Sequence, residues 1–556
     1  MGKGRRHPAQ ARESLGQPVG APRFDRSEAR PSRPPDVPQG AGRPHRALAL
    51  YRSSVLGAVI IAAYATTIVI AAAHHELWRD EVVPLSIARE MPSFLDVWRM
   101  VRHEGHPILW YVILRYSYFV FGSTAVLPVA SVLIAIAAIV VFVTQARLPL
   151  WLKALFVFGY IPIFEYSVLA RANGLAMLLL FAFCALYTAR ERYPISAALA
   201  LGALANTSAM GFVTAAAAGA MVAVDATIAS RHGERPTRRA LLATAVYVAG
   251  LAHAVVANAP DPSTLPLPLY HHSVATVVAA VWNAILSPAA HSASFLWIPL
   301  TSVWLWLAFA FLWRRPGLLA FLALSLIGFE LLFTLVYPAS PRQKGYVLLV
   351  VIATVWLWNA LARDGVPEAA GTLARAERWL GRVLLVSLTV TLGYQVVLGM
   401  RNVVDDVRFE YASSRRLGSL IASDPRLERA IVIGEPEDLT ESLPYYRDNR
   451  IYLPQEKAFR HWLMWIPGGR RGDYNLAELL ATATELRRRY DTPVVMALGW
   501  WLDGPDAQRM YAGMYVEQNF TMSAADREEF LARTEFLGRL RDATFTDENY
   551  DVFVLW

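Results

Sequence analysis

Two adjacent carboxylates, Asp80 and Glu81, follow the first long apolar run of the chain. An acidic pair is too costly to leave in hydrocarbon, so we expect it at a membrane surface or in a wet cavity. In a partly desolvated site a carboxylate can act as a general base toward a hydroxyl group. The alternative is structural, because Asp80 could cap a helix that begins near Val82.

A second pair of polar side chains, Glu104 and His106, stands just before Pro107. Two ligands at this spacing diverge on a helix but could share a divalent metal ion in an extended turn. His106 could instead orient the loop. The histidine pairs His74-His75 and His271-His272 are interpreted as loop residues, because adjacent side chains point apart in most backbones.

The segment that carries these residues is expected to lie along the membrane surface. Residues 82–103 have an amphipathic helical pattern, with apolar Ile87 and Leu95 on one side and Arg89 on the other, and such helices lie in the interface. Residues 107–122 are apolar but short and carry Arg115 in the middle. We therefore interpret them as a second juxtamembrane helix and not as a span.

The composition is that of a polytopic membrane protein, since 55% of the 556 residues are hydrophobic, more than in typical soluble proteins. Allowing roughly 20 residues for each crossing, we predict about eleven transmembrane helices. The predicted spans are residues 53–73, 124–144, 150–165, 173–189, 194–210, 212–230, 240–258, 295–313, 317–336, 346–362 and 383–400.

The formal net charge of +8 is attributed to cytoplasmic loops and not to nucleic-acid binding. Basic residues gather at alternate ends of the predicted spans, whereas the other loops carry few cations. This positive-inside pattern predicts a multi-pass membrane protein with a cytoplasmic N-terminus. The Ala- and Arg-rich composition and the short loops indicate a bacterium, so we expect the inner (cytoplasmic) membrane. The loop at 258–294 is long enough to be functional. The single cysteine, Cys184, is interpreted as a packing residue.

Three regions are expected: a disordered basic cytoplasmic tail at 1–48, a membrane domain at 49–400 and an extracytoplasmic soluble domain at 401–556. In the last region, apolar runs at 430–434, 450–453, 493–498 and 551–556 predict strands, and residues 412–422, 438–447 and 476–490 predict helices. This alternation indicates an α/β domain. It has no glycine-rich phosphate loop, so we interpret it as a lid or an acceptor-docking module.

Trp78-Arg79-Asp80-Glu81, followed by His106-Pro107-Ile108-Leu109-Trp110-Tyr111, resembles the first outer loop of GT-C-fold glycosyltransferases. These enzymes use polyprenyl-phosphate sugars and include protein O-mannosyltransferases, the lipid A aminoarabinose transferase and bacterial lipopolysaccharide sugar transferases. Glu165-Tyr166-Ser167-Val168-Leu169-Ala170-Arg171 resembles their second outer loop. The sequence departs from the family pattern at Ile108, where a second proline is common, and at Ala172-Asn173, where Pro-Tyr often follows. The resemblance covers about residues 50–400.

The resemblance implies a GT-C-like fold and an inverting transfer of a sugar from a polyprenyl-phosphate carrier to a lipid, glycan or protein acceptor. It makes Asp80 the catalytic base, with Glu81 beside it. His106 and Tyr166 would contact the substrate or its phosphate.

A leaving phosphate needs cations, and Arg171, Arg342 and Lys344 fall in outer loops that have few others. Ordinary headgroup contact is the alternative for these three residues. Members of the family differ in their use of a divalent metal, so a metal at Glu104 and His106 stays open.

Two other classes of function remain. A transporter or flippase of a polyprenyl-linked glycan would also need many spans, but such proteins tend to show internal repeats and midplane charges, whereas here the polar residues gather in outer loops. A non-catalytic envelope assembly protein would not depend on Asp80.

Overall fold

The computed structural model describes residues 43–103, 107–258, 272–287, 301–336, 339–361, 371–464, 473–512 and 516–556. The chain forms two compact units, Met1–Arg52 and Ser53–Trp556. The candidate site and all the packing discussed below belong to the second unit.

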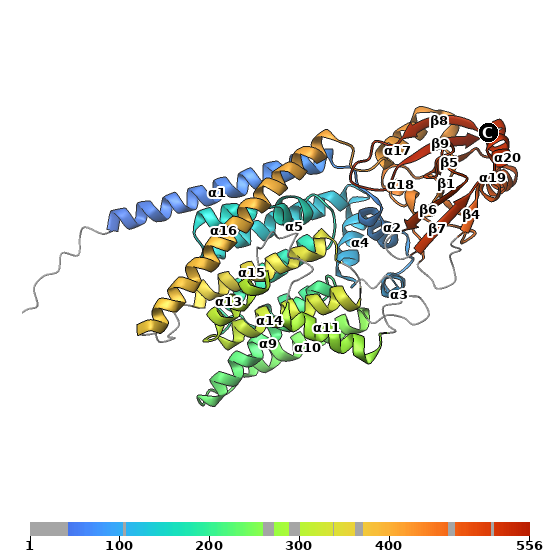
Figure 1. Ribbon diagram of the computed structural model, residues 1–556. Helices are drawn as coiled ribbons and strands as arrows, with labels where there is room; N and C mark the ends of the chain where they lie inside the picture. The colour runs from blue at the N-terminus through green and yellow to red at the C-terminus, as the bar shows by residue number, and fades with distance from the viewer. Residues whose placement is uncertain are drawn as a thin grey trace, which may run out of the picture. The chain divides into compact units, whose positions relative to one another are not determined.

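The first three-quarters of the chain are helical (Figure 1). The helices are α1 (Arg43–His74), α2 (Arg79–Glu90), α3 (Phe94–His103), α4 (Leu109–Phe121), α5 (Val126–Gln145), α6 (Leu150–Val157), the π-helix η1 (Ile161–Glu165), α7 (Asn173–Tyr187), α8 (Pro194–Ala205), α9 (Ala209–Arg231), α10 (Arg238–Asn258), α11 (Val274–Leu286), α13 (Thr301–Leu312), α14 (Pro316–Leu335), α15 (Pro341–Leu361) and α16 (Gly371–Arg408).

Within the described residues, seven helices are long and apolar enough to cross a membrane: Ser54–His74, Val126–Gln145, Ala209–Arg231, Arg238–Ala257, Pro316–Leu335, Pro341–Leu361 and Ala374–Arg408. Shorter apolar helices are Leu109–Phe121, Ala172–Tyr187, Pro194–Ala205, Val274–Leu286 and Val303–Leu312. The predicted class, a polytopic helical membrane protein, is confirmed.

Three predicted elements differ from the structure. The expected single helix at 82–103 is two helices, α2 and α3, because Pro92 disfavours a helical conformation at Met91, which is extended. The expected span at 150–165 is the eight-residue α6 followed by η1, with Gly159 between them and Pro162 unable to donate a backbone hydrogen bond. The expected loop at 258–294 contains α11, whose N-cap Ser273 accepts a hydrogen bond from the Thr276 amide.

Arg115, the charged residue within the apolar run at 107–122, binds the C-terminal end of α2. Arg115 is buried on α4 and donates hydrogen bonds to the carbonyl oxygens of Ala88 at 2.8 Å, Met91 at 2.8 Å and Pro92 at 3.2 Å. These are the carbonyls that a helix C-terminus leaves without partners. Arg115 therefore fixes α2, the helix that carries Asp80, to α4.

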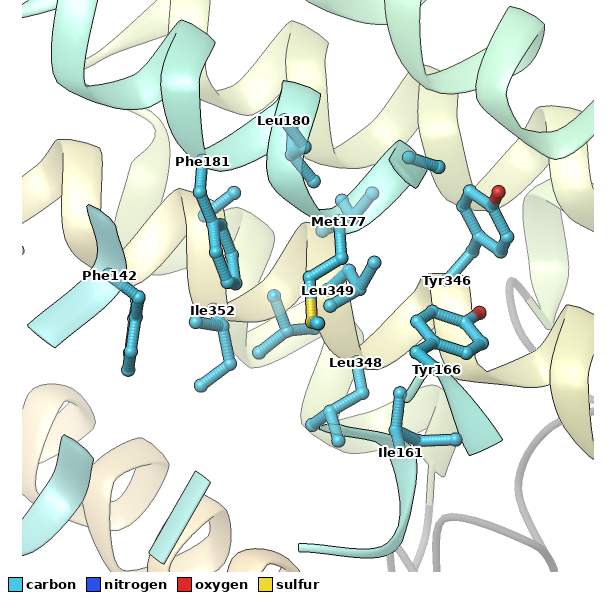
Figure 2. Packing of buried hydrophobic residues seen from close by; sticks show 14 of the residues in the cluster. Phe142, Ile161, Tyr166, Met177, Leu180, Phe181, Tyr346, Leu348, Leu349 and Ile352 are labelled. Carbon is cyan, nitrogen blue, oxygen red and sulfur yellow. The ribbon is translucent and has the colours of Figure 1, made fainter. Parts of the chain in front are cut away.

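The membrane helices pack through aromatic rings and close backbone contacts. Phe142 lies 4.9 Å from Phe156 and 5.0 Å from Phe181 between ring centroids, and Figure 2 shows Phe142, Phe181 and Ile352 in this core. A Cβ atom on Gly250 would lie 2.6 Å from the Cα atom of Gly202, so α8 and α10 can approach only because both residues are glycine. Such packing matters in lipid, where burial of apolar surface gives helices no advantage over lipid contact.

The C-terminal part of the chain contains the strands, coloured orange to red in Figure 1. Its elements are α17 (Ser414–Ser423), η4 (Pro425–Leu427), β1 (Ile431–Glu435), η5 (Glu437–Thr440), α18 (Leu443–Tyr446), β2 (Tyr452–Leu453), β3 (Ala458–Phe459), β4 (Asp473–Asn475), α19 (Leu476–Tyr490), β5 (Val494–Leu498), β6 (Ala507–Ala512), β7 (Val516–Thr521), α20 (Ala524–Arg533), β8 (Glu535–Leu540) and β9 (Tyr550–Leu555). The predicted C-terminal α/β domain is confirmed.

The main sheet has the strand order β1-β5-β9-β8. β1 runs parallel to β5, with Ile431 opposite Val494, and the other pairs are antiparallel. Alternate residues of β1 face opposite sides: Ile431 packs in a core with residues of α19, and Val432 in a second core with residues of α17. Strands buried on both faces read as continuous apolar runs, which is why β1 and β5 are visible in the sequence. Smaller sheets are β2-β3 and β4-β7-β6.

Candidate active site

Asp80 lies in the first turn of α2 and faces two arginines from distant segments. Its Oδ2 atom is 2.6 Å from Arg171 and 2.9 Å from Arg342, and 32% of its side chain is exposed. Burial opposes ionisation of Asp80, but Arg171 and Arg342 hold its pKa well below the ordinary value. The structure therefore brings together three of the predicted site residues as an ionised carboxylate between two cations.

Arg342 is held at the start of α15 by several neighbours. Its carbonyl oxygen accepts a hydrogen bond from the Tyr166 hydroxyl at 2.6 Å, and its Nε donates to Ser340 Oγ at 3.1 Å. Its guanidinium lies 5.7 Å from the centre of the Trp78 ring, a cation–π distance. Tyr166 fits against α15 because residue 345 is glycine: a Cβ there would lie 2.8 Å from the tyrosine hydroxyl. Figure 2 shows Tyr166 packed beside Tyr346 in this region.

Glu81 has a different environment from its neighbour Asp80. Its side chain is fully buried, and its Oε2 atom accepts a hydrogen bond from the Trp78 amide at 3.3 Å. Its Oε1 atom accepts one from the Ala170 amide at 2.5 Å, next to Arg171. The capping role considered for Asp80 thus belongs to Glu81, which bonds the N-cap amide of α2, and Glu81 also ties α2 to the segment that carries Arg171.

Glu81 also faces a buried histidine. His75 Nε2 lies 3.0 Å from Glu81 Oε2, and His75 Nδ1 lies 2.8 Å from Asp406 Oδ1 near the end of α16. Burial alone would lower the pKa of His75, but Glu81 and Asp406 raise it to about 10.

Two residues of the C-terminal domain bind Arg79, the residue directly before Asp80. Asp547 forms a two-pronged pair with the Arg79 guanidinium, at 2.6 and 2.8 Å. Glu548 Oε1 accepts the Arg79 amide at 2.7 Å, and its other oxygen contacts the hydroxyls of Ser414 and Ser442. Burial raises the pKa of Glu548 to about 7, against the opposing effect of Arg79.

The remaining predicted residues lie elsewhere or outside the described part. Tyr166 is buried, and its hydroxyl is occupied by the Arg342 carbonyl. Lys344 is half-buried in the first turn of α15, and no carboxylate among the described residues forms an ion pair with it. Glu104 and His106, the candidate metal ligands, lie outside the described residues, as does His271. Elsewhere in the described chain, no cluster of three or more His, Cys, Asp or Glu side chains could hold a metal ion.

No protein-family model matches this sequence, and no curated protein matches it. Among solved structures, the chain is similar to ArnT from Cupriavidus metallidurans bound to undecaprenyl phosphate. The TM-score is 0.45 and the sequence identity 13%, with 89% of this chain and 97% of that chain covered.

The sequence did not indicate the residues that support Asp80. His75 was interpreted as a loop residue, yet it is 3% exposed, and Asp406 is 2% exposed. Glu548 lies in an acidic stretch, Thr546-Asp547-Glu548-Asn549, that reads as an ordinary turn. One signal was present: Asp405 and Asp406 lie in the last turns of α16, the helix that contains the last predicted span, and acidic residues close to a span are usually paired.

Proposed function

We propose that this protein is a GT-C-like inverting glycosyltransferase. It moves a sugar from a polyprenyl-phosphate carrier to a hydroxyl group of a lipid, glycan or protein on the outer face of a bacterial cytoplasmic membrane. The multi-pass fold supports a lipid-borne donor. The motif resemblance around Asp80 and Arg171 supports the type of chemistry.

The observation that carries the proposal is the contact of Asp80 with both Arg171 and Arg342. Transfer from a sugar phosphate needs a base for the acceptor hydroxyl and cations for the leaving phosphate. In this protein the Asp80 carboxylate lies within ion-pair distance of the guanidinium groups of both Arg171 and Arg342. Two guanidinium groups also suit the several oxygens of a phosphate better than two ammonium groups would.

In the proposed reaction, the acceptor hydroxyl gives its proton to Asp80 while its oxygen attacks the anomeric carbon. The bond between that carbon and the phosphate oxygen breaks, and its electron pair leaves with the lipid phosphate. Attack comes from the face opposite the phosphate, so the configuration at the anomeric carbon inverts. Arg171 and Arg342 neutralise the charge that develops on the phosphate.

Donor binding also prepares the base in this scheme. Before the donor arrives, Arg171 and Arg342 depress the pKa of Asp80, which makes it a weak base. When the donor phosphate takes over these arginines, Asp80 loses its cationic partners and its basicity rises. The base is therefore strongest only when there is a sugar to transfer.

The positive-inside pattern supports a cytoplasmic N-terminus and an outer C-terminal domain. Lys344 and His106 remain candidate phosphate contacts, and Glu104 with His106 remains the candidate position for a divalent metal.

The test is sugar transfer in proteoliposomes from a panel of polyprenyl-phosphate sugars, with a broad acceptor mixture. Asp80→Asn is expected to lower the rate by about 10²- to 10⁴-fold, the usual contribution of a general base. Asp96→Asn is the matched control, because it changes a carboxylate of the same outer segment that pairs with Arg99. Equal rates for wild type and Asp80→Asn would move the base elsewhere. No transfer from any donor would favour a transporter or an assembly protein.

A further inference from the structure

His75 lies in a buried position between two carboxylates. Its Nε2 is 3.0 Å from Glu81 Oε2 and its Nδ1 is 2.8 Å from Asp406 Oδ1, and the three residues are 3%, 0% and 2% exposed. The three side chains come from the residue after the first span, from α2 and from α16. Two neighbouring segments and one that lies 331 residues further along the chain therefore meet at one imidazole ring.

The geometry determines the charge of this ring. A neutral imidazole has one N–H donor and one lone pair, so one of its nitrogens would direct a lone pair at an ionised carboxylate. Two buried carboxylates without a cation would also be very unfavourable. Asp406 Oδ2 is buried and has no hydrogen-bond partner in the described chain, so Asp406 depends all the more on a positive His75. When both acids are ionised, only the imidazolium, which donates from both nitrogens, satisfies them.

Other groups around the ring do not supply this charge. The Tyr411 ring lies 4.6 Å away between centroids, and the Phe164 ring 6.4 Å. Arg415 donates to the backbone oxygen of His75 at 2.6 Å and pairs with Glu76 at 3.1 Å. Arg171 also interacts electrostatically with Glu81, but His75 is the cation whose two ring nitrogens contact both the Glu81 and the Asp406 carboxylates.

Glu81 connects His75 to the candidate active site through two backbone amides. The Oε1 atom of Glu81 holds the amide of Ala170, and the next residue is Arg171. The Oε2 atom holds the amide of Trp78 at the start of α2, and the residue before Glu81 is Asp80. The separation of Asp80 and Arg171 therefore depends on a Glu81 that is ionised and fixed, and His75 keeps it so.

We propose that His75 is a positioning residue: as an imidazolium clamped between Glu81 and Asp406, it fixes the two segments that carry Asp80 and Arg171. This inference rests on the proposed function for its meaning in catalysis. Its structural content, the anchoring of the Ala170 and Trp78 amides, is independent of any activity. In this assignment Glu81 is a positioning residue too, and Asp80 alone is the base.

The first experiment is amide hydrogen exchange on the full chain in nanodiscs, which requires no substrate. In His75→Gln, the amides of Ala170 and Trp78 are expected to exchange at least about 10-fold faster, since a lost bond to a charged group corresponds to about this factor. His253→Gln is the matched control, because the ring of that exposed residue bonds the neutral side chain of Asn206 at 2.6 Å. Unchanged exchange of the two amides in His75→Gln overturns the proposal.

The second experiment is the pH dependence of transfer. Asp406→Asn keeps a hydrogen-bond acceptor for Nδ1 but removes one negative charge, so His75 should lose its proton at a pH lower by about one to two units. The alkaline limb of the rate profile should move down by the same amount, whereas a purely structural role would lower the rate at every pH. An alkaline limb that does not move contradicts the proposal.

The two experiments separate the possible failures. If the wild type shows no transfer, the proposed function fails and amide exchange still decides the role of His75. If His75→Gln does not fold, Asp406→Asn decides the matter through the same amides, because it keeps the shape of the cluster. Exchange at Ala170 and Trp78 that equals the wild type in Asp406→Asn at pH 9 would then refute the role of the imidazolium.

Discussion

Replacing Asp80 by asparagine should lower turnover by about 10²- to 10⁴-fold and at the same time tighten the binding of a polyprenyl phosphate. In the empty site, Asp80 occupies both Arg171 and Arg342. A phosphate that binds there must compete with the carboxylate for these guanidinium groups. Asparagine has nearly the same shape but no charge, so it is a weaker competitor.

The magnitude follows from the two contacts. Two unit charges about 4 Å apart attract by about 1 kcal/mol in water and about 4 kcal/mol near a protein surface, so removing the charge of the partly exposed Asp80 weakens each contact by roughly 1 kcal/mol. Two contacts give about 2 kcal/mol, which corresponds to about 30-fold tighter binding. Asp80 is partly exposed, and solvent screening places the result toward the lower side of this value.

The assay is titration of the purified full chain in detergent with a polyprenyl phosphate that carries no sugar, followed by tryptophan fluorescence. Trp78, which contacts Arg342, is a suitable reporter. Asp96→Asn should bind as the wild type does. Weaker or unchanged binding by Asp80→Asn, in a variant that melts at the wild-type temperature, would show that the arginines do not exchange the carboxylate for phosphate, and the reasoning would be refuted.

Three further predictions concern the supports of the site. Arg342→Lys keeps the charge but loses the planar group that spans Asp80, Ser340 and Trp78, so the KM for the donor should rise about 10-fold; an unchanged KM would remove Arg342 from the clamp. The pKa of Glu548 is raised from 4.5 to about 7 in the folded state, so between these pH values the folded protein binds a proton that the unfolded chain does not. The free energy of unfolding should therefore fall by about 3 kcal/mol as the pH rises from 4.5 through 7. Thermal unfolding of Glu548→Gln should lack this pH dependence, and the same pH dependence as in the wild type would contradict the assignment. Arg115→Met should destabilise the protein by about 2–3 kcal/mol, because three carbonyls lose a charged donor, and a melting temperature equal to the wild type would contradict the capping role.

The membrane helices were predictable where their apolar runs were continuous. The predicted span at 124–144 corresponds to α5 (Val126–Gln145), because few polar residues interrupt it. The predicted span at 150–165 failed because periodicity does not register the local effect of Gly159 and Pro162. In the C-terminal domain, the apolar strands β1 and β5 were found, whereas β6 and β7 were missed because their sequences are too polar to stand out.

In the candidate site, too, single residues could be identified from the sequence, whereas their contacts could not. Asp80, Arg171 and Arg342 were each identified from residue type and position in an outer loop, but their contact depends on the fold. One of the two partners of His75, Asp406, lies 331 residues further along the chain, and no local pattern connects two such positions. The misassigned helix cap has a related cause: the start of α2 is three residues earlier than expected, so Glu81 and not Asp80 faces the N-cap amide.

The C-terminal domain contacts the stretch just before the base at nearly every residue. The Tyr411 amide donates to Glu76, Arg415 to the His75 carbonyl and Tyr446 to the Leu77 carbonyl. Asp547 and Glu548 then hold Arg79.

These contacts reach the backbone or a buried side chain and leave Asp80 as the residue that projects toward Arg171 and Arg342. A lid would be expected to close over the substrate through mobile contacts, whereas Glu548 bonds the Arg79 amide in a buried position and the Arg79 guanidinium, paired with Asp547, is itself nine-tenths buried. We therefore propose that the domain is part of the frame that holds Asp80, and a chain without it should lose the geometry at Asp80 even if every membrane helix remained in its position.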